Sequence, residues 1–155
     1  MKLPIAAALA ALALFAAPPE PVTLKVRPPV TPLKAGARFK VDVVAQIQKG
    51  WHVYGLKPME NGPVATRVWV ADGLVVLPAG TVEGTDPQTM QDPTFNMEVQ
   101  IYEGEVTFTV PLRLAPSAAP GALKFFVNAS YQSCDNQICL PPKTVKLEVP
   151  LTVTN

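Results

Sequence analysis

The sequence predicts an all-β fold, an antiparallel immunoglobulin-like sandwich. Several segments alternate apolar and polar residues with the period of two that half-buried strands show. No segment beyond the N-terminal apolar run keeps a helical period. Eighteen prolines and nine glycines are scattered along the chain, which is typical of many short strands joined by turns.

The N-terminus has the features of an export signal. Lys2 precedes an apolar run from Leu3 to Ala17, which Pro18 ends. The run is shorter than the roughly 20 residues of a spanning helix. Residues 1–17 are therefore predicted to be a signal peptide, with a retained membrane anchor as the alternative. The protein is expected in the periplasm or another extracytoplasmic compartment.

The proline-rich stretch 18–35 is predicted to be a linker, in which only Val22 to Val26 could pair as an edge strand. The folded domain is expected over residues 36–155. A domain of this length buries roughly two-thirds of its unfolded surface. It does not need a disulfide in order to fold.

The first half of this domain contains three predicted strands and an extended segment. Residues 39–47 and 64–70 alternate strictly, 51–54 are expected to be extended, and 74–77 form a short strand candidate. Residues 78–93 are mostly Gly, Thr, Asp, Gln and Pro and are predicted to be a long irregular loop. Loops of this length are often functional.

The second half is predicted to be extended at 97–102 and to form strands at 106–114, 123–131 and 145–153, each with an apolar stripe. Pro111 lies on the outward face of its strand and has no amide proton. The strand is therefore expected at a sheet edge, or bulged at this residue.

The loop between the last two strands holds both cysteines, Cys134 and Cys139. Paired antiparallel strands lie within the range of a disulfide, so the two can bond if they flank the turn. The bond could be a structural staple worth about 2 kcal/mol. It could instead be a reversible two-electron couple that exchanges with other dithiols. The spacing alone leaves both interpretations open.

The charges of the chain are balanced, with 13 basic and 12 acidic residues. No field is present to attract nucleic acid or an anionic membrane. Within the cysteine loop, Asp135 follows Cys134, and Lys143 is the nearest cation beyond Cys139. Nothing in the sequence favours a thiolate here, so the thiols are expected to react slowly unless a partner positions them.

His52 is the only histidine, and on a strand it is expected to be a hydrogen-bonded packing residue. With two thiols it could bind Cu(I), but Met59, Met90 and Met97 show no ligand spacing relative to the cysteines. No metal site is predicted. No cofactor is expected other than the disulfide itself.

Residues 131–142, together with 50–54 and 95–111, resemble the periplasmic N-terminal domain of the DsbD family of transmembrane thiol:disulfide interchange reductases. The resemblance covers roughly residues 38–153, and the Tyr-Gln-x-Cys…Cys-x-Pro-Pro block is its most specific part. It implies an immunoglobulin-like sandwich. It also implies a domain that relays reducing equivalents from the membrane machinery to periplasmic disulfide isomerases and thioredoxins of cytochrome c maturation.

The resemblance also implies roles for five residues. Cys139 matches the cysteine that forms a mixed disulfide with partners, and Cys134 matches the one that resolves it. Phe95 matches an aromatic residue on a cap loop that covers the disulfide until a partner displaces it. His52 and Tyr54 fall where the family has aromatic residues beside the active site.

The chain departs from the family pattern in three ways. Well-studied members have one more residue between the cysteines. Pro93 and Thr94 stand where those members carry acidic residues, with Asp92 one step away, so no proton-transfer role is predicted for a cap carboxylate. The sequence also ends at Asn155, as one module alone, and the electron donor is expected to be another polypeptide.

Two functions follow as hypotheses. The first is an exported, monomeric protein-disulfide reductase module that takes electrons from a membrane thiol transporter. Its acceptors would be extracytoplasmic thioredoxin-like proteins or disulfide isomerases, and nucleic acid is not expected as a partner. The alternative is a non-catalytic immunoglobulin-like binding module whose hairpin disulfide is structural.

Overall fold

The computed structural model describes residues 19–155, and the predicted signal peptide lies outside the described residues. All regular elements in the described part of the chain are β-strands, arranged in three sheets. The all-β prediction is therefore confirmed. No helix capable of crossing a membrane is found within residues 19–155.

The first sheet has the strand order β1-β3-β10-β6, and β7 pairs with a further part of β10. All of its pairings are antiparallel. Its strands are β1 (Val22–Arg27), β3 (Arg38–Ile47), β6 (Val76–Pro78), β7 (Glu83–Gly84) and β10 (Glu105–Leu114).

The second sheet has the order β2-β13-β11-β5. The pairing of β2 with β13 is parallel, and the other two pairings are antiparallel. Its strands are β2 (Leu33–Lys34), β5 (Arg67–Val70), β11 (Gly121–Tyr131) and β13 (Lys143–Thr154).

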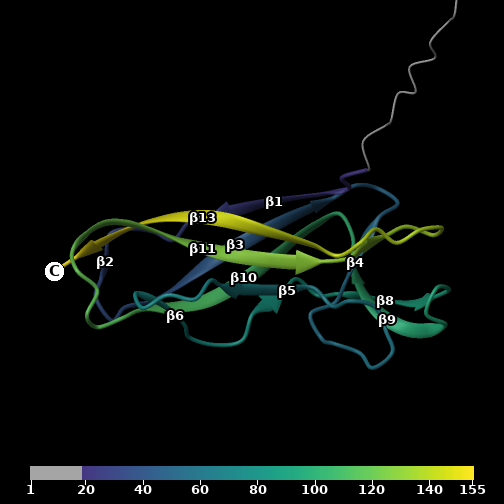
Figure 1. The fold of residues 1–155 in the computed structure, drawn as a ribbon, viewed down its shortest axis with the longest axis horizontal. Coiled ribbons are helices and arrows are strands. Elements are labelled where there is room, and N and C mark those ends of the chain that lie inside the picture. Colours follow the sequence, from purple (N-terminus) through teal and green to yellow (C-terminus); the bar gives the residue numbers. More distant parts are fainter. Residues whose placement is uncertain (1–18) are drawn as a thin grey trace, which may run out of the picture.

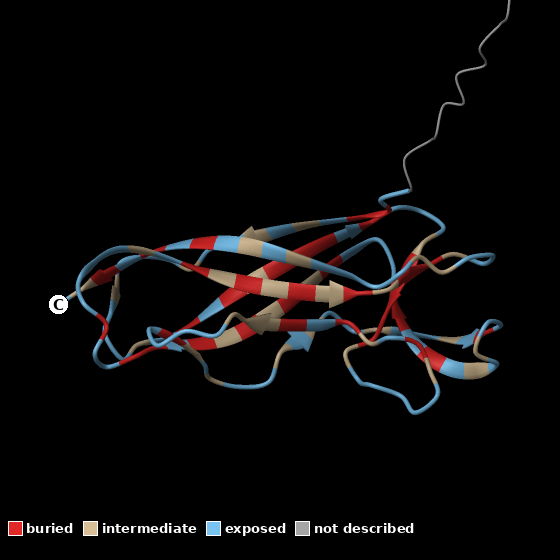
Figure 2. Cartoon of the chain, in the orientation of Figure 1, coloured by how far each residue is buried: buried red, intermediate tan, exposed pale blue. Residues whose placement is uncertain are grey.

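The first two sheets pack face to face around one apolar core. The alternating residues of the long strands point inward, so that buried and exposed positions follow one another along each strand (Figure 2). Phe39 on β3 meets Phe125 on β11 edge to face, with ring centroids 6.1 Å apart. Val41 and Val127 are fully buried in the same core. The predicted sandwich is confirmed.

A third sheet lies at one end of the sandwich and has the order β12-β4-β9-β8. Its strands are β4 (His52–Tyr54), β8 (Gln88–Asp92), β9 (Met97–Tyr102) and β12 (Ser133–Cys134). The loop between β11 and β13 projects at this same end, and the C-terminus lies at the opposite end (Figure 1). The third sheet and the cysteine loop are therefore neighbours.

The stretch predicted as a linker contributes two strands. The edge strand that the sequence allowed at Val22 to Val26 is present as β1, whereas no strand was expected at the position of β2. β1 pairs with β3 along all six of its residues, and Val22 is buried in the core. Prolines 28, 29 and 32 lie in the connection between the two strands and interrupt neither of them. The high proline content suggested a linker at the position of an ordinary edge strand.

The predicted irregular loop 78–93 contains β7 and β8, so that prediction is also wrong. β8 pairs with β9 over five residues, ending at Asp92 opposite Met97. Three of the five residues of β8 are exposed, and Met90 is its only apolar residue. An edge strand of this kind has no apolar stripe for a sequence pattern to reveal.

β10 is an inner strand, which corrects the expectation of an edge at Pro111. On one side β10 pairs with β3 through this residue. On the other side, Pro111 lies between the short segments that pair with β6 and β7. Its carbonyl accepts a hydrogen bond from the Ala79 amide at 2.9 Å. Pro111 has no amide proton, and at its position neither β6 nor β7 needs a hydrogen bond from β10.

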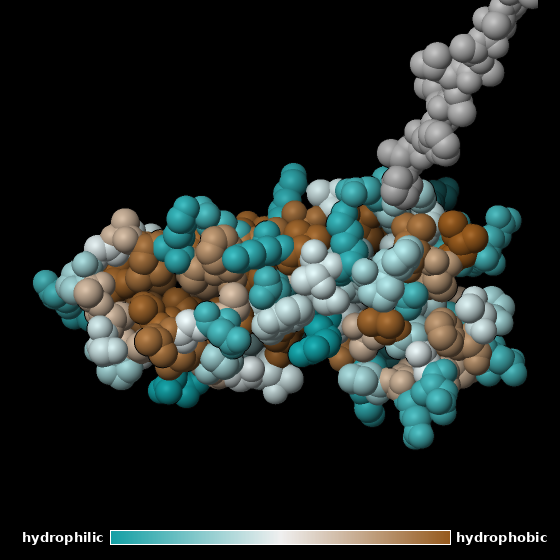
Figure 3. All heavy atoms as spheres, viewed as in Figure 1, coloured by the Kyte–Doolittle hydropathy of each residue, from teal (hydrophilic) through white to brown (hydrophobic). Residues whose placement is uncertain are grey.

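Apolar surface is unevenly distributed over the molecule. On the face shown in Figure 3, apolar atoms form a continuous area at the end of the sandwich remote from the cysteine loop. The end that carries the third sheet is more mixed, with many hydrophilic side chains. On this face, the cysteine loop is therefore not surrounded by a broad apolar surface.

Candidate active site

Cys134 and Cys139 are joined by a disulfide with an S–S distance of 2.04 Å. The two residues also form an isolated antiparallel bridge. The Asp135 amide donates to the Ile138 carbonyl at 2.9 Å and closes the turn between them. The two cysteines therefore flank a turn, which is the condition under which the sequence allowed them to bond.

The conformation of this turn is encoded locally by Asp135. Its carboxylate accepts hydrogen bonds from the amides of Gln137 and Ile138, each at 2.7 Å. These backbone hydrogen bonds hold the pKa of the exposed Asp135 carboxyl below its ordinary value. An aspartate that bonds the amides ahead of it is a common way to fix a tight turn.

The two sulfurs differ in how accessible they are. Cys134 is only 1% exposed, because its strand β12 pairs with β4. Cys139 is partly exposed, and the neighbouring Ile138 is 51% exposed. An incoming thiolate can therefore approach Cys139 more readily than Cys134.

Tyr54 connects the disulfide to a buried carboxylate. Its hydroxyl lies 2.8 Å from Asp92 Oδ2, 3.2 Å from Cys134 Sγ and 3.9 Å from Cys139 Sγ. The phenol has one proton, which it donates to the carboxylate as the stronger acceptor. The phenol oxygen then remains in contact with the sulfur of Cys134.

Burial raises the pKa of Tyr54 well above its ordinary value, and the hydrogen bond to Asp92 and the charge of that carboxylate raise it further. The phenol therefore stays protonated at neutral pH. It can act beside the sulfurs as a hydrogen-bonding group and not as a base.

Phe95 lies in the four-residue turn between β8 and β9, which Asp92 organises. Asp92 Oδ1 accepts hydrogen bonds from the amides of Thr94 at 2.7 Å and Phe95 at 3.1 Å. The Phe95 ring meets the Tyr54 ring edge to face, with centroids 6.0 Å apart. It packs in the small apolar cluster that also holds both cysteines and is separate from the main core.

His52 is brought to the same place, because it pairs directly with Cys134 across β4 and β12. Its ring meets the Tyr54 ring edge to face at 5.3 Å. The side chain is 4% exposed, and Nε2 has no hydrogen-bond partner among the described residues. The expectation of a hydrogen-bonded packing histidine is therefore wrong for this nitrogen. Burial lowers the pKa of His52, against an opposing effect of nearby carboxylates.

The sequence interpretation did not place Asp92 in the candidate active site. The carboxylate is only 2% exposed and accepts hydrogen bonds from one phenol and two amides. A local signal was present, since Asp followed by Pro and Thr is a turn-forming sequence. Its contact with Tyr54 could not be seen, because the two residues are 38 positions apart.

Lys143 does not supply a free positive charge to the cysteines. Its Nζ pairs with Glu20 Oε1 at 2.8 Å. Within residues 19–155, no three His, Cys, Asp or Glu side chains are grouped so as to hold a metal ion. Among the described residues, the hydrogen-bonding group found at the two sulfurs is therefore the hydroxyl of Tyr54.

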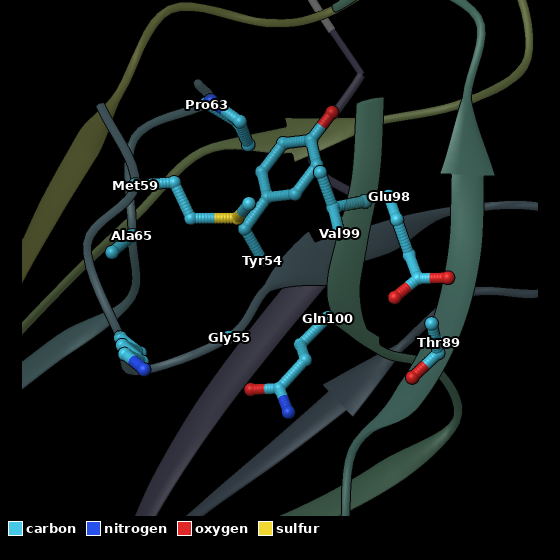
Figure 4. Close-up of a pocket in the computed structure, with 10 residues that line it drawn as sticks. Tyr54, Gly55, Met59, Pro63, Ala65, Thr89, Glu98, Val99 and Gln100 are labelled. Atoms are coloured by element: carbon cyan, nitrogen blue, oxygen red, sulfur yellow. The ribbon is translucent and has the colours of Figure 1, made fainter. Parts of the chain in front are cut away.

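A pocket of about 250 Å³ adjoins the site through Tyr54. Met59 and Pro63 line it on one side of the tyrosine and Glu98 lies on the other (Figure 4). Neither cysteine lines this pocket. It is therefore not the place where a partner thiol reaches the disulfide.

Two solved structures show a similar fold. The DsbD N-terminal domain of Neisseria meningitidis in its reduced form is 18% identical, with a TM-score of 0.51 over 76% of this chain and 78% of that one. The N-terminal periplasmic domain of ScsB from Proteus mirabilis is also 18% identical, with a TM-score of 0.53 over 83% of this chain. The present chain spans 44% of that ScsB structure. No curated protein sequence matches significantly.

A family profile described as the N-terminal part of the thiol:disulfide interchange protein DsbD matches residues 19–151. The match begins before β1 and includes the linker region that proved to be folded. It therefore covers both sheets of the sandwich, the third sheet and the cysteine loop. The chain belongs to the family of DsbD N-terminal domains.

Proposed function

We propose that this protein is an exported thiol-disulfide relay domain that acts as a protein-disulfide reductase. It takes reducing equivalents from a membrane thiol electron transporter and passes them to extracytoplasmic protein disulfides. Acceptors of this kind are thioredoxin-like proteins, such as those of cytochrome c maturation, and disulfide isomerases. The domain works as a monomer in the periplasm or a comparable compartment.

One observation supports this proposal above the others. The Cys134–Cys139 disulfide lies at one end of the sandwich, with Cys134 buried and Cys139 partly exposed. Membership of the DsbD N-terminal family supports thiol-disulfide exchange as its chemistry. The ScsB domain, a periplasmic domain of similar fold, supports the location.

The difference in exposure supports Cys139 as the residue that exchanges with partners and Cys134 as the residue that resolves. A donor thiolate attacks Cys139 Sγ, the Cys134–Cys139 bond breaks, and Cys134 leaves as a thiolate that takes up a proton. The second thiolate of the donor then attacks the donor sulfur of the mixed disulfide, the bond to Cys139 breaks, and Cys139 leaves as a thiolate that takes up a proton. The donor becomes oxidised, and the Cys134–Cys139 pair holds two electrons and two protons.

Phe95 would shield the disulfide between encounters, because it packs against Tyr54 in the cluster that encloses both sulfurs. A partner would have to displace the turn that carries it in order to reach Cys139. Tyr54 would keep its hydroxyl beside the sulfurs in both oxidation states.

Replacing both cysteines by Ala distinguishes the relay from a binding module with a stapled hairpin. The relay predicts a variant that stays folded, because a loop this short contributes only about 2 kcal/mol, but that transfers no electrons. Circular dichroism and a thioredoxin-coupled reduction assay would measure the two properties. A double variant that still binds its natural partner in a cell extract as tightly as the wild type would support the module instead.

A further inference from the structure

His52 is a buried basic group in the candidate active site for which the proposed exchange has so far no use. It is directly opposite Cys134 in the antiparallel pairing of β4 and β12. Side chains of directly opposite residues point to the same face, with Cβ atoms about 4.5–5.5 Å apart. Tyr54, two residues along the same strand, shares this face and reaches Cys134 Sγ at 3.2 Å.

The unsatisfied nitrogen of His52 calls for an explanation. Nε2 is buried without a hydrogen-bond partner among residues 19–155, and buried polar atoms in native proteins are nearly always paired. In the oxidised state the sulfur of Cys134, the residue opposite His52, has no proton to donate. Reduction converts this sulfur to a thiol. A thiol can donate a hydrogen bond to the unprotonated nitrogen of a neutral imidazole.

We propose that His52 accepts the proton of the Cys134 thiol when Cys134 resolves a mixed disulfide at Cys139. This inference rests on the relay function proposed above. It gives a specific task to a position at which the family resemblance implies only an aromatic ring.

The step balances as follows. The proton moves from Cys134 Sγ to His52 Nε2, and the resulting thiolate attacks Cys139 Sγ. The bond between Cys139 and the partner sulfur breaks, and the partner leaves as a thiolate with the electron pair. The Cys134–Cys139 bond forms, and the imidazolium returns its proton to the leaving thiolate or to solvent.

The surroundings keep His52 in the form that this task needs. The charged groups that face it are Asp92 at the end of β8, Glu103 after β9 and Asp135 after β12, and each favours the imidazolium. Burial outweighs them and holds the pKa of His52 below 6.5. The ring is therefore neutral at pH 7 and free to accept a proton, while the three carboxylates stabilise the imidazolium that forms.

The test uses the reduced protein and the aromatic disulfide DTNB. Attack by Cys139 releases one coloured thiolate, and attack by Cys134 on the resulting mixed disulfide releases a second, which stopped-flow absorbance follows as a separate phase. In the wild type the second phase should keep a nearly constant rate from about pH 8 down to the pKa of His52 and fall below it. Because His52 is the only histidine, its ring proton signal gives that pKa independently by NMR.

His52→Phe keeps a ring of similar shape, and His52→Gln keeps a polar group that does not titrate. Both should slow the second phase at least about tenfold at pH 7, with a rate that rises tenfold per pH unit up to the thiol pKa near 8.5. Tyr131→Phe, a buried ring of the main core, should leave the phase unchanged.

A wild-type second phase that rises tenfold per pH unit through the His52 midpoint would overturn the inference without any variant, and so would equal rates in the His52 variants. Either result would leave the relay function intact. Absence of a second phase in the wild type would instead remove the relay function itself.

Discussion

Replacing Cys134 by Ala is expected to stop the exchange halfway and to leave Cys139 bonded to its partner. The reason is that the partly exposed sulfur can still attack or be attacked, while the buried sulfur that would release the partner is gone. Mixing the reduced variant with an oxidised extracytoplasmic thioredoxin-like protein should give a 1:1 complex. Non-reducing gels and intact mass would show the complex, and multiple-turnover reduction should fall to background.

The matched control is Cys139→Ala, which leaves only the sulfur that is 1% exposed. This variant should form no more than traces of complex under the same conditions. Equal trapping by both variants would contradict the division of roles between the two cysteines. Trapping by Cys139→Ala alone would reverse it.

Replacing Asp92 by Ala should have the second largest effect, because it removes one acceptor from three buried or half-buried donors. The Tyr54 hydroxyl and the amides of Thr94 and Phe95 all lose their partner. Hydrogen bonds to a charged group contribute more than neutral ones, so the free energy of unfolding should fall by about 2–4 kcal/mol. Urea denaturation of the oxidised protein would measure the loss.

The same change should loosen the turn that carries Phe95 and expose Cys139. The rate at which dithiothreitol reduces the disulfide should rise severalfold, beyond what a surface change produces. Asp92→Asn keeps an oxygen for the two amides and should behave more like the wild type. Asp86→Ala replaces an exposed aspartate that precedes β8 and should change neither property. A reduction rate that is the same in Asp92→Ala and Asp86→Ala would show that this turn does not shield the disulfide.

The sequence predicted those parts of the fold in which one face of a strand is buried. β3, β10, β11 and β13 lie in the sandwich and alternate as strands with one buried face must. β8 was missed because it is an edge strand in which Met90 is the only apolar residue, so no apolar stripe marks it. β1 was recognised only as a possible edge strand, because the prolines around it suggested a linker.

The candidate site divides in the same way between local and long-range information. The cysteine turn could be predicted, because Cys134 and Cys139 are five positions apart. The contact of Tyr54 with Cys134 joins residues 80 positions apart, and only the family resemblance pointed to it. The burial of Asp92 depends on the pairing of β8 with β9, and β8 is the strand that the sequence pattern did not reveal.

The most direct test is the equilibrium of the purified domain with thiol buffers of known potential. The fractions of oxidised and reduced Cys134–Cys139 would be measured after alkylation, by intact mass. A relay requires a potential above about −300 mV, so that partner dithiols can reduce the bond. A disulfide that remains oxidised in buffers poised at or below about −300 mV would be a structural staple, and the proposed function would be wrong.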